Sequence, residues 1–355
     1  MKRVAVVARR GAGEAARVAA AALAPQHGGG PRVSYGREVP RPGAHASGGF
    51  VKLQRLQEDF PDTRTRFNIL YLGSNTLPLA PRPLLAVARR RGIPVVWNQD
   101  GVAYPAWRGT GWEWVNAPMR RGLHAAAHVL YQSAFCKEAA DRFLGDPAGA
   151  WEVLHNAVDT EAFAPAPRPE RPLTLILGGN QYQRYRYETA LRTLALLPGA
   201  RLVVTGELSW RPGAAAEGAA LVDRLGLRGR VEHAGRYAQA EAPDVLRRGD
   251  LLLHTKVNDP CPSVVLEAMA CGLPVVHSAT GGTPELVGDA GVGVPSLATW
   301  EREEPPDPGE LAAGIERVAA DLAGYATRAR SRAVERFDVR PWLERHRQIF
   351  ESLLA

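Results

Sequence analysis

The sequence predicts an α/β protein built from two parallel-sheet domains. The chain has 355 residues, which is more than one ordinary hydrophobic core accommodates. Short apolar runs alternate with helix-like patterns through both halves, as in parallel strands joined by helices. Residues 165–172 are rich in proline and predict a stiff, extended linker. We therefore expect one domain over residues 1–165 and a second over residues 172–339.

Several elements are expected in the first half. The strands are residues 4–8, 33–35, 67–73, 93–97, 127–131 and 151–154, and the helices are 14–23, 51–60, 83–91 and 134–144. Residues 26–31 form a glycine-rich break between the first helix and the second strand. An aromatic-rich loop is expected around Tyr104, Trp107, Trp112 and Trp114.

The second half shows the same alternation. We expect strands over residues 173–177, 201–205, 250–254 and 273–276, and helices over 188–197 and 263–271. An amphipathic helix follows around Leu311, Ile315, Val318 and Leu322. A last helix carries Trp342, Ile349, Phe350 and Leu353 at helical spacing.

Composition excludes several classes of protein. Hydrophobic residues make up 45% and charged residues 23% of the chain, as in soluble globular proteins. No stretch approaches the roughly 20 apolar residues of a membrane span, and residues 1–7 read as a strand start rather than a signal peptide. The expected location is the cytoplasm. The three cysteines, Cys136, Cys261 and Cys271, have neither the number nor the spacing of a zinc site or a disulfide framework.

The net charge of +7 is carried mostly by arginine. Local clusters at residues 89–91 and 120–121 are most simply solvated helix faces. A second reading is peripheral association with an anionic membrane, at about 1 kcal/mol per basic residue near the lipid. Nucleic-acid binding is not expected, because no recognition motif and no basic run interleaved with aromatics is present.

Residues 259–282 are the most informative stretch. Ser263 is a good N-cap before an apolar run, and the first amides of the expected helix form a natural phosphate seat. Glu267 places a carboxylate among apolar neighbours, and Asp259 precedes it by eight positions. One reading is a favourable helix-dipole interaction of an acid near the helix start, worth up to about 1 kcal/mol. The other is a pair of carboxylates that converge on one ligand.

This stretch resembles the signature of the retaining glycosyltransferases of family 4, which have the GT-B fold of two Rossmann-like domains facing across a cleft. The second acid of the family's Glu-x7-Glu motif matches Glu267, and Asp259 replaces the first with a side chain shorter by one methylene. The resemblance implies that Asp259 faces the donor sugar and that Glu267 binds the nucleotide ribose. The backbone of Pro262, Ser263 and Val264 would hold the diphosphate.

Other segments extend the resemblance. Residues 154–165 are similar to the family's domain junction, and the last helix, residues 340–355, is expected to cross back onto the first domain. The loop after residue 177 would supply Arg184 and Arg186 to the donor diphosphate, as guanidinium groups pair well with phosphate oxygens. Arg236 and Tyr237 are candidates for contacts with the nucleobase.

The first domain offers weaker candidates. Gly49, beside Gly48 and before a helix with Lys52, resembles the family's glycine loop near the donor phosphates and the acceptor; an ordinary loop glycine is the alternative. Asp100 stands where many family members carry a histidine, so it either contacts acceptor or sugar or the family's role is absent. Trp107 stacks on a sugar ring or anchors a long loop.

The expected reaction is retaining transfer of a sugar from a nucleoside diphosphate sugar to a hydroxyl acceptor, with no cofactor and no metal ion. A nucleotide-sugar epimerase or hydrolase on the same fold is a second hypothesis. A non-catalytic carbohydrate- or nucleotide-binding protein is a third. The sequence does not identify the nucleotide base, the sugar, the acceptor or the oligomeric state.

Overall fold

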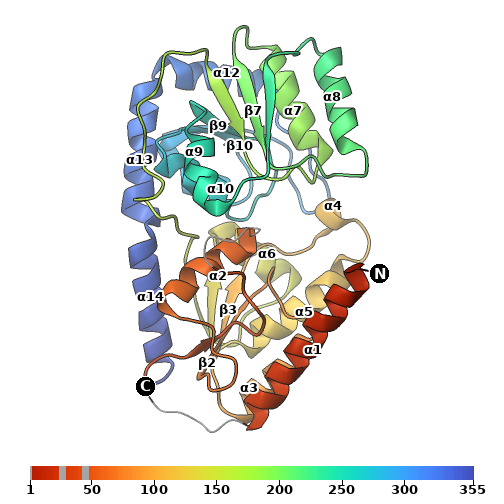
Figure 1. Cartoon of the computed structure of the whole chain (residues 1–355), viewed down its shortest axis with the longest axis vertical. Helices are drawn as coiled ribbons and strands as arrows, with labels where there is room; N and C mark the ends of the chain where they lie inside the picture. The colour runs from red at the N-terminus through yellow and green to blue at the C-terminus, as the bar shows by residue number, and fades with distance from the viewer. Residues whose placement is uncertain (1, 24–28, 42–47) are drawn as a thin grey trace. The chain divides into compact units, whose positions relative to one another are not determined.

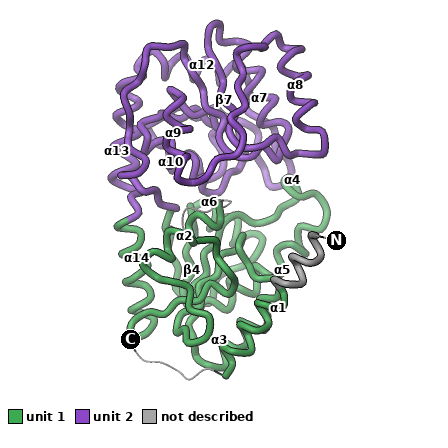
Figure 2. Tube along the Cα trace, viewed as in Figure 1, with its two compact units in different colours: residues 1–155, 340–355 green, residues 156–339 purple. Residues whose placement is uncertain are grey.

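The computed structural model of the chain describes residues 2–23, 29–41 and 48–355, and the side chains of residues 2–10 lie outside this description. The chain divides into two compact units (Figure 2). Unit 1 comprises Met1–His155 with Arg340–Ala355, and unit 2 comprises Asn156–Val339. Each unit is a parallel sheet with helices, so the two α/β domains predicted from the sequence are present.

The sheet of unit 1 has five strands in the order β1-β2-β3-β4-β5, all paired in parallel. They are β1 (Val33–Ser34), β2 (Ile69–Gly73), β3 (Val95–Gln99), β4 (His128–Tyr131) and β5 (Ala150–Val153). Strands β2 and β3 are buried along their whole length, in keeping with their near-continuous apolar runs. Each expected strand from residue 33 onward is therefore observed, with shifted ends.

The helices of unit 1 connect and cover these strands (Figure 1). They are α1 (Lys2–Leu23), α2 (Gly48–Asp59), α3 (Pro81–Arg90), α4 (Pro105–Arg108), α5 (Trp112–Ala125), α6 (Ala134–Phe143) and α14 (Val339–Ser352). The expected strand over residues 4–8 is wrong, because these residues belong to α1. The Ala-rich run that follows has high helix propensity, and no proline interrupts it, so the helix continues back through the valines. The expected break at residues 26–31 lies partly outside the described residues.

Helix α14 completes the core of unit 1. Its Phe350 ring lies 4.9 Å from the Phe60 ring, and its His346 bonds Tyr71 of β2. Trp342, Ile349 and Phe350 are buried, so the apolar face read from the sequence is the packed face. The last helix of the chain thus packs on residues of the first half (Figure 2).

The sheet of unit 2 has six parallel strands in the order β11-β10-β9-β6-β7-β8. They are β6 (Thr174–Leu177), β7 (Arg201–Thr205), β8 (Val231–Gly235), β9 (Leu251–His254), β10 (Val275–Ser278) and β11 (Gly291–Val294). From β6 the chain moves outward through β7 and β8, then returns to β9 on the other side of β6. The order of the strands therefore reverses between β6 and β9.

The helices of unit 2 are α7 (Arg184–Ala195), α8 (Ala214–Arg224), α9 (Ala242–Leu246), α10 (Ser263–Ala270), α11 (Thr283–Val287), α12 (Pro308–Ala320) and α13 (Leu322–Phe337). Two apolar clusters pack against the sheet, and Phe163 belongs to the one that holds α10 and α13. Residues 156–165, which the sequence placed with the first domain, therefore lie in unit 2. Asn156 also bonds Cys261 there.

Five local expectations need correction. Pro262, not Ser263, is the N-cap of α10, and no side chain caps this helix. Helix α7 begins at Arg184, so the predicted Arg184 and Arg186 lie in its first turn rather than in a loop. Gly49 lies within α2. The aromatic segment forms α4 and α5 instead of a loop, because Pro105 suits a helix start and good helix formers follow Trp112. The amphipathic stretch after residue 308 is broken at Asp321 into α12 and α13.

Candidate functional site

The carboxyl ends of β6 and β9 mark the candidate site in unit 2. In open parallel sheets, ligands bind outside the carboxyl ends of strands at the point where strand order reverses. The segment after β6 begins with Gly178 and Gly179, and the segment after β9 leads through Asp259 into α10. The informative stretch of the sequence therefore lies at the reversal point of the sheet.

The backbone around Asp259 is held on several sides. Asn258 has a left-handed backbone with φ of 50°, and its amide donates to Thr280 Oγ1. The amide of Gly282 donates to the carbonyl of Asp259 at 2.8 Å. A Cβ on Gly281 would lie 2.6 Å from the amide nitrogen of Asp259, so only glycine permits this approach. The glycine pair after β10 thus fixes the position of Asp259.

The Asp259 carboxylate is buried and charged. Burial alone would raise its pKa, but the charge of Lys256 and the hydrogen bond from His254 lower the pKa well below its usual range. Lys256 Nζ lies 3.0 Å from Oδ1, and His254 Nε2 lies 3.1 Å from Oδ2. Burial lowers the pKa of His254, so its imidazole is neutral at pH 7 and donates from Nε2. Asp259 is an anion with one partner on each oxygen.

Glu267 lies in the second turn of α10 and is also buried, with 5% of its surface exposed. Gln239, from the segment after β8, donates to its Oε1 at 2.8 Å. Tyr237 lies on the same side, since Glu267 contributes to the raised pKa of its phenol, which burial brings to about 12. The predicted ribose ligand therefore has polar neighbours from the β8 loop.

Glycines shape the turn after β6. A Cβ on Gly178 would lie 2.5 Å from Val264 Cγ2, so this turn runs directly against the first turn of α10. The amide of Gly179 donates to Thr205 Oγ1 at the end of β7. A helix start has amides without intrahelical partners and the positive end of the dipole. The close turn and the helix start together provide backbone donors for an anion.

The predicted arginines lie in different surroundings. Arg184 is half exposed, and its Nε lies 3.0 Å from Glu217 of α8. Arg186 is buried and donates to the carbonyls of Asn180 and Gly178. Arg236 is exposed and pairs with Glu207 at 2.6 Å. Of the three, Arg186 lies at the candidate site, because Asp259 contributes to its pKa.

A second polar cluster lies at the carboxyl ends of β2 and β3 in unit 1. The amide of Asp100 donates to Ser74 Oγ at 2.9 Å, and its carboxylate accepts a bond from Asn75. A Cβ on Gly49 would lie 2.5 Å from Asn75 Oδ1. The structure thus brings the predicted Gly49 and Asp100 to the side chain of one asparagine, Asn75.

Lys52 of α2 reaches the same sheet edge but is 4% exposed. Its Nζ donates to Asn98 Oδ1 at 2.6 Å, and Gln132 donates to the same oxygen at 2.7 Å. Lys52 is therefore buried at the edge of the sheet and bonds the end of β3.

Trp107 is 51% exposed on the short helix α4. Two aromatic residues near it in the sequence are packed instead. Tyr104 stacks on Phe143, and Trp112 meets the same ring edge-on, with the ring centroids 5.1 Å apart. The packing role predicted as an alternative thus applies to Tyr104 and Trp112, while Trp107 presents its ring to solvent.

Sequence reasoning missed three residues of the unit 2 site. His254, Lys256 and Gln239 contact the two predicted carboxylates. The signal for His254 and Lys256 was weak: they are polar residues that end or closely follow a buried strand, at the edge where ligands gather. Gln239 follows the partly exposed β8 and carried no such signal. His254 and Lys256 precede Asp259 by five and three positions, so this signal was readable but unspecific.

Two sequence models of known protein families match this chain. The sequence model described as Glycosyl transferases group 1 matches residues 158–334. A second model, Glycosyltransferase Family 4, matches residues 2–162. The chain belongs to glycosyltransferase family 4.

Among curated relatives of this family 4 chain is the D-inositol 3-phosphate glycosyltransferase of Mycobacterium marinum. It is 34% identical over 155 residues, which are 41% of this chain and 33% of the relative. The same enzyme of Mycobacterium tuberculosis is 30% identical over 201 residues, 54% of this chain and 40% of the relative. The matched region thus spans less than half the length of these relatives.

Solved structures share the GT-B fold with this family 4 chain. HepE from Anabaena, solved with UDP and glucose, superposes with a TM-score of 0.66 at 20% identity, over 85% of this chain and 81% of that chain. The predicted GT-B fold of two Rossmann-like domains is therefore confirmed.

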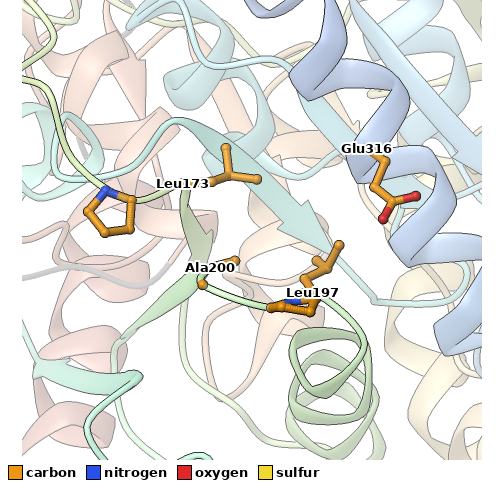
Figure 3. Close-up of a pocket in the computed structure, with 7 residues that line it drawn as sticks. Leu173, Leu197, Ala200 and Glu316 are labelled. Carbon is orange, nitrogen blue, oxygen red and sulfur yellow. The ribbon is translucent and has the colours of Figure 1, made fainter.

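A hollow of about 450 Å³ lies elsewhere in unit 2 (Figure 3). Leu173, Leu197, Ala200 and Glu316 line it, at the amino ends of β6 and β7. This is the sheet edge opposite to the family 4 motif, so the hollow is separate from the candidate site. Within the described residues, no group of three metal-ligating side chains occurs and no helix is long and apolar enough to cross a membrane.

Proposed function

We propose that this chain is a retaining glycosyltransferase that moves a sugar from a nucleoside diphosphate sugar to a hydroxyl acceptor. One observation carries the proposal: the buried Asp259 and Glu267 flank the start of α10 at the point where the strand order of unit 2 reverses. Membership in family 4 supports it.

In this proposal unit 2 binds the donor. Glu267 accepts hydrogen bonds from the ribose hydroxyls, with Gln239 holding its other side. The amides of Ser263 and Val264 bind the diphosphate at the positive end of α10. Asp259 accepts from hydroxyls of the sugar, and its fixed charge orients the anomeric carbon toward the acceptor.

The reaction breaks the bond between the anomeric carbon and the diphosphate oxygen and forms a bond from that carbon to the acceptor oxygen. Departure and attack occur on the same face, which retains the configuration. The acceptor proton passes to the leaving diphosphate, whose charge is stabilised by backbone amides and cationic side chains. No metal ion is required in this scheme, so the rate should be unchanged in EDTA.

In this proposal unit 1 binds the acceptor, with Asp100 and Trp107 as contacts. Asp100 is partly exposed at the carboxyl edge of its sheet, and Trp107 presents its ring to solvent. Trp114, which is 82% exposed on α5, and the exposed Arg121 further along the same helix favour an anionic lipid surface near a membrane-bound acceptor. Sedimentation with anionic and with neutral vesicles tests this association.

The donor site is tested by binding. We expect one of UDP, GDP, ADP and TDP to bind in isothermal titration, and UDP is the first choice because solved neighbours contain UDP or UDP-glucose. Glu267→Gln removes a charge that accepts two hydroxyl bonds and should weaken binding about 10- to 100-fold. Glu217→Gln on α8, outside the motif, is the control and should bind as the parent does.

The outcome of turnover separates the three hypotheses. A transferred sugar with the donor's anomeric configuration, observed by NMR, supports a retaining transferase. Sugar release or epimerisation without an acceptor favours the epimerase or hydrolase. Tight nucleotide binding without any turnover favours the binding protein, above all if the Asp259→Asn variant functions as the parent does.

A further inference from the structure

The cations expected at the donor diphosphate are engaged with other groups. Arg184 pairs with Glu217 at 3.0 Å and with Glu188 of its own helix at 3.4 Å. Arg186 is 6% exposed, and its two terminal nitrogens donate to the carbonyls of Asn180 and Gly178. Arg184 therefore stabilises the contact between α7 and α8, and Arg186 stabilises the turn after β6.

Lys256 is placed differently. It follows β9 by two residues, on the side of the reversal point opposite to the Gly178 turn, and lies in the segment that leads into α10. Its side chain is 28% exposed, while that of Asp259 is 12% exposed. An ammonium group carries three donors, and one of them is directed at Asp259 Oδ1. Lys256 therefore contacts the buried Asp259 and is also partly exposed to solvent at the site.

The surroundings of Asp259 hold Lys256 in place. His254 of β9, which is 1% exposed, bonds Oδ2 of Asp259. The carboxylate therefore cannot rotate without losing this bond. Other ionisable groups around the cluster include Arg186, Tyr185 and His277. Glu303 also lies close, because its Oε1 accepts from Asn258 Nδ2 at 3.0 Å and its charge acts on Tyr185. Burial keeps His277 neutral, with a pKa lowered to about 4. Tyr185 is uncharged, and its hydroxyl accepts a hydrogen bond from the amide of Val257. This bond fixes the backbone of the residue after Lys256.

We propose that Lys256 is the side-chain cation that contacts the diphosphate of the bound donor, and that Asp259 and His254 are positioning residues for its ammonium group. This inference rests on the proposed function and deepens it. The ammonium would stabilise the negative charge that develops on the leaving diphosphate as the anomeric bond breaks. Its pairing with Asp259 restrains it before the donor binds, which reduces the entropy lost on binding.

The test compares Lys256→Gln with Arg184→Gln, a matched removal of one charge. The ligands are the nucleoside diphosphate that binds in the titration screen and its own nucleoside, measured by ligand-observed NMR. We expect Lys256→Gln to weaken the diphosphate about 10- to 100-fold and the nucleoside by less than about 2-fold. Arg184→Gln should leave both affinities within about 2-fold, and Lys256→Arg should recover most of the diphosphate affinity.

Three results would overturn the assignment. One is unchanged diphosphate binding in Lys256→Gln, above all if Arg184→Gln weakens it. Another is an equal loss of nucleoside and diphosphate affinity, with no recovery in Lys256→Arg, because this indicates a collapsed site. If the parent protein binds no nucleoside diphosphate, the proposed function fails and the assignment with it. Melting temperatures of all variants accompany the titrations.

Discussion

At the residue scale, the candidate site depends on the side chains that stabilise the buried charge of Asp259. Asp259 replaces the longer acid of the family motif, yet its two oxygens are both occupied by polar groups from the end of β9. The shorter arm leaves fewer rotamers to restrain, and Gly281 lets the neighbouring chain approach its backbone. The charge of Asp259 is thus supported by contacts on both backbone and side chain.

Gly281 offers a test of this backbone support. Gly281→Ala places a Cβ 2.6 Å from the Asp259 amide nitrogen at a φ of 68°, whereas Gly213→Ala meets open space at a φ of 85°. We expect Gly213→Ala to cost about 1 kcal/mol of unfolding free energy, from the left-handed backbone alone. Gly281→Ala should cost about 2 to 4 kcal/mol, because the contact is added. Urea denaturation measures both.

The two alanine variants should also differ in nucleotide binding. Gly281→Ala displaces Asp259 and with it Lys256, so the affinity for the nucleoside diphosphate falls, while Gly213→Ala retains the parent affinity. Equal stability losses in the two variants would show that the close approach of Gly281 contributes nothing.

At the element scale, α14 shows how one helix combines apolar packing with a buried titratable group. His346 is fully buried beside Trp342 and Phe350. Its Nδ1 donates to the carbonyl of Trp342 at 2.8 Å, and its Nε2 accepts from Tyr71 at 3.2 Å. The bond that Nε2 accepts requires the neutral ring, and burial lowers the pKa of His346 to about 4.

This burial predicts a loss of stability in acid. The unfolded chain binds a proton at His346 near pH 6.5 and the folded chain only near pH 4, so the stabilisation is complete above pH 6.5 and falls as the pH drops toward 4. The loss should be roughly 3 kcal/mol. His346→Gln cannot take up this proton, so its unfolding free energy should change less over this range. Parallel pH profiles of the two proteins would contradict the assignment.

At the scale of the whole molecule, two units with separate cores are joined by a chain that crosses between them twice. Phe350 packs in unit 1 although it lies near the end of the chain, while Leu191 of α7 belongs to an apolar cluster of unit 2. Each unit therefore has its own set of core contacts, and unit 1 depends on residues distant in the sequence.

We expect core truncations to act unit by unit. Phe350→Ala should cost about 3 to 5 kcal/mol and reduce amide protection mainly in unit 1. Leu191→Ala should cost about 2 to 5 kcal/mol and reduce protection mainly in residues 156–339. Hydrogen exchange followed by mass spectrometry distinguishes the two patterns. A loss spread evenly over both units in both variants would show that they unfold together.

Periodicity and short motifs sufficed for much of the architecture. The apolar runs at residues 67–73 and 250–254 predicted buried strands because a strand covered on both faces has no polar alternation. Asp259, Glu267 and the glycines around them carried the family resemblance that predicted the candidate site, because these features are local in sequence. Residues 4–8 were misread, since strand and helix propensities compete over a short valine-rich segment.

The sequence by itself determined the alternation of strands and helices, the two-domain architecture and the positions of the two acids. The tertiary structure decided which side chains meet across elements: Arg184 of α7 pairs with Glu217 of α8, and Gln239 after β8 donates to Glu267 of α10. Helices and strands follow from the propensity and burial of residues close in sequence, so the sequence reveals them. The partner of a long cationic side chain depends on the positions of several elements, which no local pattern encodes.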